Sequence, residues 1–117
     1  VYVQDNQVEE ISALSSLSNL EMLDISNNRV ADIKPLEDIG RLQALLIDNN
    51  LIEDLSPLRH LGHLETLNIA GNPVKDLRPL VEMAGLRNVF IDQRQASLET
   101  AKDLQDRSDV VVVQYEM

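Results

Sequence analysis

The sequence contains no cysteine and only four glycines. Without cysteine the chain has no disulfide, no thiol nucleophile and no cysteine-ligated zinc site, although this absence does not distinguish the cytosol from the cell exterior. Four glycines, scattered along the chain, form no glycine-rich phosphate loop, and the Gly-x-Ser-x-Gly motif of serine hydrolases is missing. We therefore expect no enzyme activity and no cofactor.

Aromatic and basic residues are also scarce. Aromatics make up 3% of the chain and hydrophobic residues 44%, so Leu, Ile and Val must supply the core. Only 10 Lys and Arg oppose 20 Asp and Glu, which gives a net charge of −10. Such a charge repels phosphate backbones and anionic lipid surfaces, and we expect no nucleic-acid partner. No run of 18 apolar residues occurs, so we expect no direct membrane insertion.

The chain does contain a repeat with a period of 22 residues. Residues 20–36 (LEMLDISNNRVADIKPL), 42–58 (LQALLIDNNLIEDLSPL) and 64–80 (LETLNIAGNPVKDLRPL) align without a gap. A fixed period of this length indicates a solenoid, in which each unit packs only on its neighbours. Residues 1–19 fit the same register one unit earlier but lack its start. We therefore expect the chain to be a piece of a longer protein.

Each unit predicts a strand followed by a tight turn. Leu45 and Ile47 are two residues apart, which places both on one face of a strand. Ile52, Leu55 and the following leucines are three apart, which suits a 3₁₀-like path, and Pro57 opposes a longer helix. Asp54 is expected to cap that segment.

An asparagine follows each strand where the chain must turn. A buried asparagine side chain can both donate to and accept from backbone groups. We expect these side chains to stack in a structural column, while Asn49, the neighbour of one of them, faces outward. The column consists of Asn6, Asn28, Asn50 and Asn72.

The pattern L-x-x-L-x-I-x-x-N-x-I resembles the signature of leucine-rich repeats. Its D-[IL]-x-P-L half is similar to the 22-residue class found in bacterial internalins and in a regulatory subunit of protein phosphatase 1. The resemblance covers residues 1 to about 92. It implies an α/β solenoid: a right-handed coil with a parallel β-sheet on its concave face and short 3₁₀ or irregular convex segments.

The C-terminal residues depart from the repeat. We assign residues 1–95 to about four and a half repeats, truncated at the N-terminus, and residues 96–117 to a helix–strand cap. Ser97 is expected to begin a helix that runs to about Arg107, and a strand is expected to follow. That strand contains Val110, Val111, Val112 and Val113.

This last strand is expected to leave one edge of the sheet bare. Bare apolar edges recruit other strands, so we expect a following domain or a second copy of the chain to cover it. The alternative is that the preceding helix packs over the end and Glu116 discourages pairing.

Residues that point outward from the strands are the candidates for partner binding. They lie between core positions, and in the resembling family the concave face commonly binds proteins. Unlike the rest of the unit, they differ from repeat to repeat. The candidates are Tyr2, Met22, Asp24, Leu46, Asp48, Asn68, Asn88, Phe90 and Asp92. His60 and His63 flank a core leucine on the convex side, and we interpret them as a solvated pair and not as metal ligands.

Three functions remain open. The internalin-like interpretation is a protein-binding module of a bacterial surface or secreted protein, and the regular units without cysteine favour it. The second is an intracellular scaffold that positions an enzyme. The third is a spacer or cap for a neighbouring domain that binds nothing itself.

Overall fold

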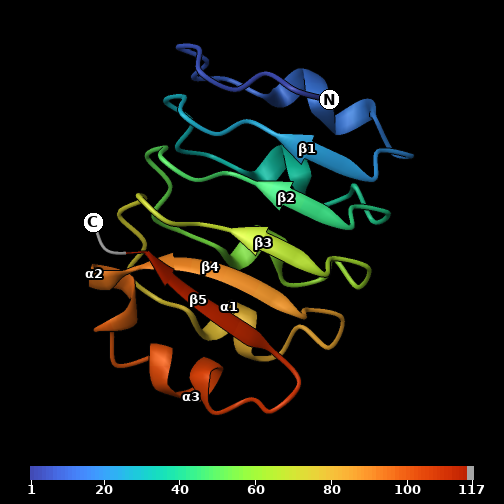
Figure 1. Ribbon diagram of the computed structural model, residues 1–117. Helices are drawn as coiled ribbons and strands as arrows, with labels where there is room; N and C mark the ends of the chain where they lie inside the picture. The colour runs from blue at the N-terminus through green and yellow to red at the C-terminus, as the bar shows by residue number, and fades with distance from the viewer. Residues whose placement is uncertain (116–117) are drawn as a thin grey trace.

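The computed structural model describes residues 1–115, and its 22-residue units form the successive coils of a solenoid (Figure 1). Five strands pair in parallel and in chain order to form one sheet. The strands are β1 (Met22–Asp24), β2 (Ala44–Leu46), β3 (Thr66–Asn68), β4 (Asn88–Asp92) and β5 (Val111–Tyr115). The predicted leucine-rich-repeat solenoid is therefore confirmed.

The register of the sheet follows the period of the sequence. Asp24 pairs with Leu46, Leu46 with Asn68, and Asn68 with Phe90. The strand expected at Tyr2 is reduced to one bridge between Tyr2 and Asp24. This first segment has a neighbouring coil on one side only, and 65% of the surface of Tyr2 is exposed.

The opposite side of each coil consists of short helical turns. These are the 3₁₀ turns η1 (Ser12–Ser16), η2 (Lys34–Leu36) and η3 (Ser56–Leu58), followed by the single α-helical turn α1 (Arg78–Val81). The prediction of mostly non-α connections is confirmed. In η3 the Asp54 carboxylate accepts a hydrogen bond of 2.9 Å from the Ser56 N–H, but the N-cap position is Leu55, so Asp54 lies one residue before the predicted cap. Asp32 and Asp76 form the equivalent bonds at η2 and α1.

The core is a stack of aliphatic side chains between the sheet and these turns. Within one coil, Leu45 and Ile47 of the strand side and Ile52, Leu55 and Leu58 of the turn side are at most 1% exposed. Burying a leucine or isoleucine fully is worth about 1.5–3 kcal/mol. Because each coil contributes the same set, stability accumulates coil by coil.

The end of the chain differs from the prediction of one helix. Two short helices form, α2 (Gln93–Ala96) and α3 (Ala101–Gln105). Ser97 does not begin a helix but ends α2. The N-cap of α2 is Asp92, whose carboxylate accepts from the Gln95 N–H while the Gln95 side chain accepts from the Asp92 N–H. This capping box starts the helix earlier than the sequence pattern predicted.

The two helices and β5 close the C-terminal end of the stack (Figure 1). Ala101 and Leu104 of α3 are fully buried. Arg107 donates to the carbonyl oxygens of Leu80 and Met83, at 3.3 and 2.8 Å, and so ties the end of α3 to α1 and the turn that follows it. The predicted helix–strand cap is therefore present, with a broken helix.

β5 is the last strand of the sheet, as predicted, and Val111 is 59% exposed. Val111 and Val113 pair with Asn88 and Phe90, so they extend the outward-facing rows. Glu116, which was expected to discourage edge pairing, lies outside the described residues.

Candidate protein-interaction face

The buried asparagines join neighbouring coils. The Asn50 side chain donates to the carbonyl oxygen of Ile47 in its own coil and to that of Ile25 in the preceding one, at 3.1 and 3.0 Å. Its oxygen accepts from the Val30 N–H at 3.0 Å. Asn28 and Asn72 make the equivalent bonds. These three side chains therefore join the turn after each strand to the neighbouring coils.

The two ends of this column differ from its middle. Asn6, expected to be part of the column, is exposed, and its amide donates to the carbonyl oxygens of Val3 and Gln4. At the other end Arg94 stands where the pattern predicts asparagine, and the neighbouring Gln95 takes the role. The buried Gln95 amide donates to the Ile69 carbonyl oxygen at 2.7 Å. The longer glutamine side chain compensates for the shift of one position.

A second column precedes the asparagines and was missed in the sequence. Asp5, Asn27, Asn49 and Gly71 have φ angles of 61°, 57°, 56° and 77°. Asp, Asn and Gly are the residues that adopt this left-handed conformation most readily, so the 22-residue recurrence of these three types was the signal. Asn49 is exposed as predicted, but its backbone conformation constrains which residue can stand there.

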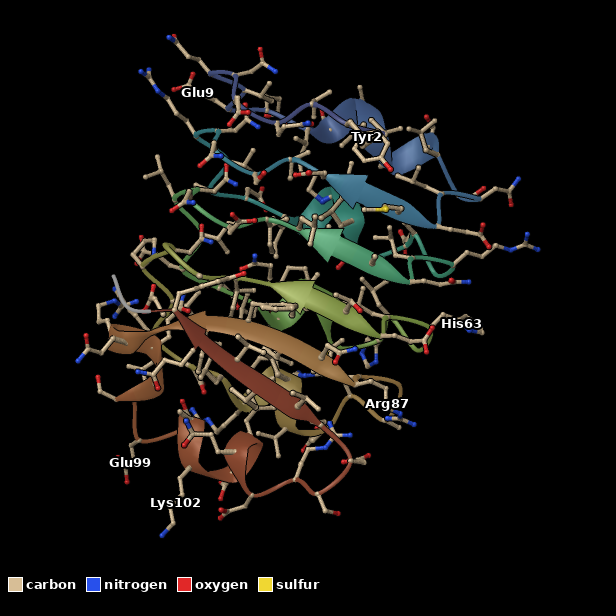
Figure 2. The ribbon with its side chains drawn as sticks, in the orientation of Figure 1. Tyr2, Glu9, His63, Arg87, Glu99 and Lys102 are labelled. Carbon is tan, nitrogen blue, oxygen red and sulfur yellow. The ribbon has the colours of Figure 1, made fainter. Side chains whose placement is uncertain are left out.

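The candidate interaction face is the solvent side of the five-stranded sheet, called the sheet face below (Figure 2). Tyr2 lies at its N-terminal end, whereas His63 and Arg87 lie at the margin where the chain enters the strands (Figure 2). Met22, Asp24, Leu46, Asp48, Asn68 and Phe90 are half-buried, and Asn88 is exposed. The register therefore brings these sequence-predicted residues onto one surface.

Asp92 does not belong to this surface. It is 5% exposed, and its two carboxylate oxygens accept from the Gln95 and Gly71 N–H groups at 2.7 Å each. The prediction that Asp92 contacts a partner is therefore corrected: its carboxylate holds the last regular coil and α2 together. Alternation along the strand indicated an outward side chain, but the capping box turns it toward the backbone.

Tyr115 on β5 is a member of the sheet face that the sequence did not identify. Its ring stacks on Phe90 with the centroids 5.9 Å apart and the planes at 19°, and 41% of its surface is exposed. Tyr115 also borders a hollow of about 220 Å³ together with Asp48, Asn49, Asn68 and Ala70. The strand was predicted on its valines, so Tyr115 was not among the outward-facing candidates.

The charged side chains of the sheet face are negative. None of the five strands contains Lys or Arg, while Asp24 ends β1 and Asp48 follows β2. Burial raises the pKa of the Asp48 carboxyl, and the negative charges of Asp24 and Asp5 raise it further. A carboxylate in this position is stabilised by an added positive charge.

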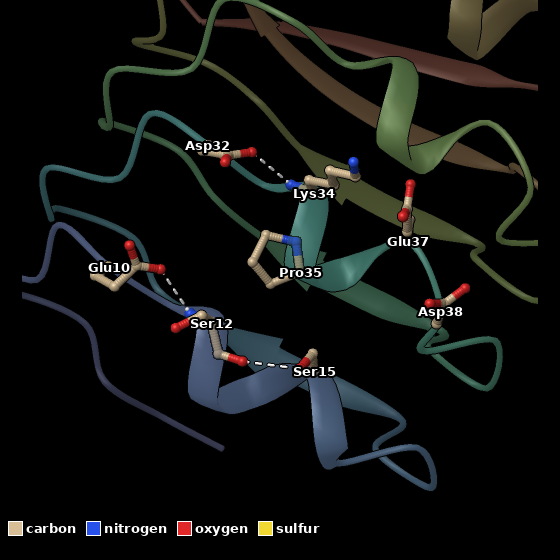
Figure 3. Close-up of a pocket in the computed structure, with 8 residues that line it drawn as sticks. All are labelled: Glu10, Ser12, Ser15, Asp32, Lys34, Pro35, Glu37 and Asp38. Carbon is tan, nitrogen blue, oxygen red and sulfur yellow. Dashed lines mark hydrogen bonds between the residues drawn. The ribbon is translucent and has the colours of Figure 1, made fainter.

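The hollows on the turn side follow from the repeat. One, of about 440 Å³, lies between η1 and η2 (Figure 3). Two of its four carboxylates already bind backbone: Glu10 accepts from the Ser12 N–H and Asp32 from the Lys34 N–H. An equivalent hollow recurs one coil later beside Asp54. A feature that recurs from one pair of coils to the next is a product of the fold and does not mark a specific site.

No group of three or more potential metal ligands is assembled within residues 1–115. His60 and His63 are both exposed. In the same part of the chain, no helix has the length and apolar character needed to cross a membrane.

Comparison with known proteins places these observations in a family. The family described as leucine-rich repeats (two copies) matches residues 1–38 and 40–91. An internalin C2 of Listeria monocytogenes is 38% identical, with a TM-score of 0.75, over 77% of this chain and 40% of that one. No curated protein matches the chain.

Two further solved structures share the fold at lower identity. An internalin (inlF) of Listeria monocytogenes is 24% identical with a TM-score of 0.66, and the match covers 96% of this chain and 41% of the internalin. A leucine-rich-repeat protein of Leptospira interrogans is 18% identical with a TM-score of 0.78, and the match covers 96% of this chain and 30% of that protein. The chain thus spans less than half the length of each. The buried asparagines, the parallel sheet and these matches together show that the chain belongs to the leucine-rich-repeat family and is internalin-like.

Proposed function

We propose that this chain is a protein-interaction module that binds its partner through the sheet face, the concave side of the repeat coil. The observation that carries the proposal is the contrast between constant and variable columns. The columns that build the turns repeat asparagine, aspartate and proline at 22-residue spacing, whereas the central row of the sheet face reads Tyr2, Asp24, Leu46, Asn68 and Phe90. The fold does not require these five residues, and variation there supports selection by a partner.

The contact region combines apolar and acidic groups. Leu46, Phe90 and Tyr115 provide half-buried or exposed apolar surface, and Asp24 and Asp48 flank it. Aromatic anchors surrounded by polar groups are typical of binding hot spots. Tyr2, Met22, Asn68 and Asn88 complete the proposed contact set, from which Asp92 is removed. The chain contributes no catalytic chemistry of its own.

We propose further that the chain is part of a larger bacterial surface or secreted protein. The support is its likeness to internalin C2 over 77% of its length, together with regular units that lack cysteine. The competing interpretations are an intracellular scaffold that positions an enzyme and a spacer without a partner.

The test measures the affinity of a partner isolated with the chain as bait. Leu46→Glu and Phe90→Glu place a carboxylate in the apolar part of the face, and we expect each to weaken binding by about tenfold or more with little change in melting temperature. His60→Glu, an exposed change on the turn side, is the matched control and should leave affinity unchanged. Loss of binding with His60→Glu alone would refute the sheet face as the site, and finding no partner would favour the spacer.

A further inference from the structure

The hollow beside Tyr115 has a chemistry that the other hollows lack. It has a volume of about 220 Å³ and lies on the sheet face, where the side chains of three different strands or their following turns border it. Ala70 is buried at its base, and this small side chain leaves the space open. The hollow exceeds several-fold the ~30 Å³ that one water molecule occupies in the liquid. It therefore accommodates the tip of a side chain.

The walls of the hollow are suited to a planar cation. Asp48 contributes a half-buried carboxylate to the lining. Tyr115 contributes an aromatic ring, and its stacking on Phe90 fixes the ring's position. The carboxamides of Asn49 and Asn68 complete the polar part of the lining. A guanidinium group forms paired hydrogen bonds to carboxylates and stacks on aromatic rings, whereas an ammonium group does only part of this.

The charge around the hollow also favours a cation from outside the chain. The five strands contribute no Lys or Arg to the face. The Asp48 carboxylate receives one weak side-chain hydrogen bond, of 3.4 Å, from the adjacent Asn49 amide. Burial and the charges of Asp24 and Asp5 raise its pKa, so that a bound cation offsets both effects. By contrast, Glu10 and Asp32 of the turn side already accept from backbone N–H groups, and Asp76 from the Arg78 guanidinium.

We propose that the hollow between Asp48 and Tyr115 binds an arginine side chain of the protein partner. The proposal rests on the proposed function, because it assigns a recognition chemistry to the same face. In the complex the guanidinium bonds to the Asp48 carboxylate and stacks on the Tyr115 ring, while the apolar residues around Leu46 contact the neighbouring part of the partner. Binding by this contact weakens with added salt, since it depends on a charge pair.

The test uses a defined probe and therefore needs no partner. N-acetyl-arginine N-methylamide is titrated into the ¹⁵N-labelled chain, and amide shifts are followed by NMR. We expect saturable shifts confined to the residues that border the hollow. N-acetyl-citrulline N-methylamide, a neutral analogue of the same shape, should give none, and the lysine analogue should bind more weakly.

Three variants make the test specific. Asp48→Asn should weaken arginine binding by about tenfold or more, and Tyr115→Ala should weaken it severalfold. Glu37→Gln removes one exposed negative charge from the turn side and should leave binding unchanged. Melting temperatures establish that each variant is folded.

Several outcomes would overturn the proposal. These are the absence of saturable shifts, shifts spread over carboxylates on both sides of the solenoid, or equal binding by Asp48→Asn and the wild type. The interaction function is judged separately, because Leu46→Glu tests partner binding without involving the hollow. If the arginine probe fails while Leu46→Glu still weakens the partner, only the arginine site is wrong.

Discussion

Removing the asparagines one at a time should destabilise the chain to different degrees, even though the substitution is always Asn→Ala. The carbonyl oxygens that Asn50 binds each retain a second donor, because Ile25 is also bonded by Asn28 and Ile47 also by Asn72. The group left without a partner is the buried Val30 N–H. An unsatisfied buried donor costs about 1–3 kcal/mol, and the lost side-chain bonds add to this.

The other positions follow from the same reasoning. The Asn72 oxygen accepts from two buried N–H groups, those of Asn50 and Ile52, each at 3.1 Å. Asn72→Ala therefore leaves two donors unsatisfied. We expect losses of about 3–5 kcal/mol for Asn72→Ala and about 2–3 kcal/mol for Asn50→Ala. Asn6→Ala, at an exposed site, should cost less than about 0.5 kcal/mol.

Urea denaturation of the three variants measures this series. The matched control is Asn49→Gly, which removes a neighbouring amide and keeps the positive φ accessible, so it should change stability by less than about 1 kcal/mol. Asn49→Ala is unsuitable as a neutral control, because alanine in that left-handed conformation costs about 1–2 kcal/mol. Equal losses at positions 6, 50 and 72 would refute the assignment of the hydrogen bonds between coils.

Three further outcomes are expected. Gly71→Ala should lower the free energy of unfolding by about 2 kcal/mol or more, since the φ of Gly71 is 77° and a Cβ there would lie 2.2 Å from the Asn49 Oδ1. Adding Asn49→Gly should restore part of this stability in a double-mutant denaturation cycle, and no recovery would contradict the close contact. Burial raises the folded-state pKa of Asp48 above 3.8, so the folded chain binds the Asp48 proton more tightly than the unfolded chain does, and the contribution of Asp48 to stability falls as pH rises above 3.8. Asp48→Asn should remove that decline in urea titrations at several pH values. An unchanged pH slope in the variant would contradict this assignment. Light scattering should show concentration-dependent association through the bare edge of β5, reduced by Val111→Lys, whereas a wild-type chain that stays monomeric at high concentration excludes edge pairing.

The solenoid was predictable because its information is periodic. The two-residue and three-residue spacing around Leu45 and Leu55 determined the strand and the 3₁₀ turn, and the 22-residue recurrence determined the register of the sheet. In any single unit the assignment of strand and turn was ambiguous, but agreement among three units removed the ambiguity.

The parts that were mispredicted lie where the repeat stops. No second copy existed to show that Gln95 replaces the column asparagine or that Asp92 and Gln95 form a capping box. The burial of Asp92 depends on that local bond network and not on strand alternation. Tyr115 became part of the face because β5 extends two residues beyond its valines. For the sheet face, periodicity predicted which residues point outward, but it carries no information on how their side chains lean together.

Photo-crosslinking from both sides of the solenoid gives the most direct test of the sheet face as the contact surface. p-Benzoylphenylalanine is placed at Leu46 on the sheet face or at His60 on the turn side, and each variant is irradiated with the isolated partner. The prediction is that the partner crosslinks from position 46 and not from position 60. Crosslinking from position 60 alone, with both variants folded and equally reactive toward an added small-molecule trap, would contradict it.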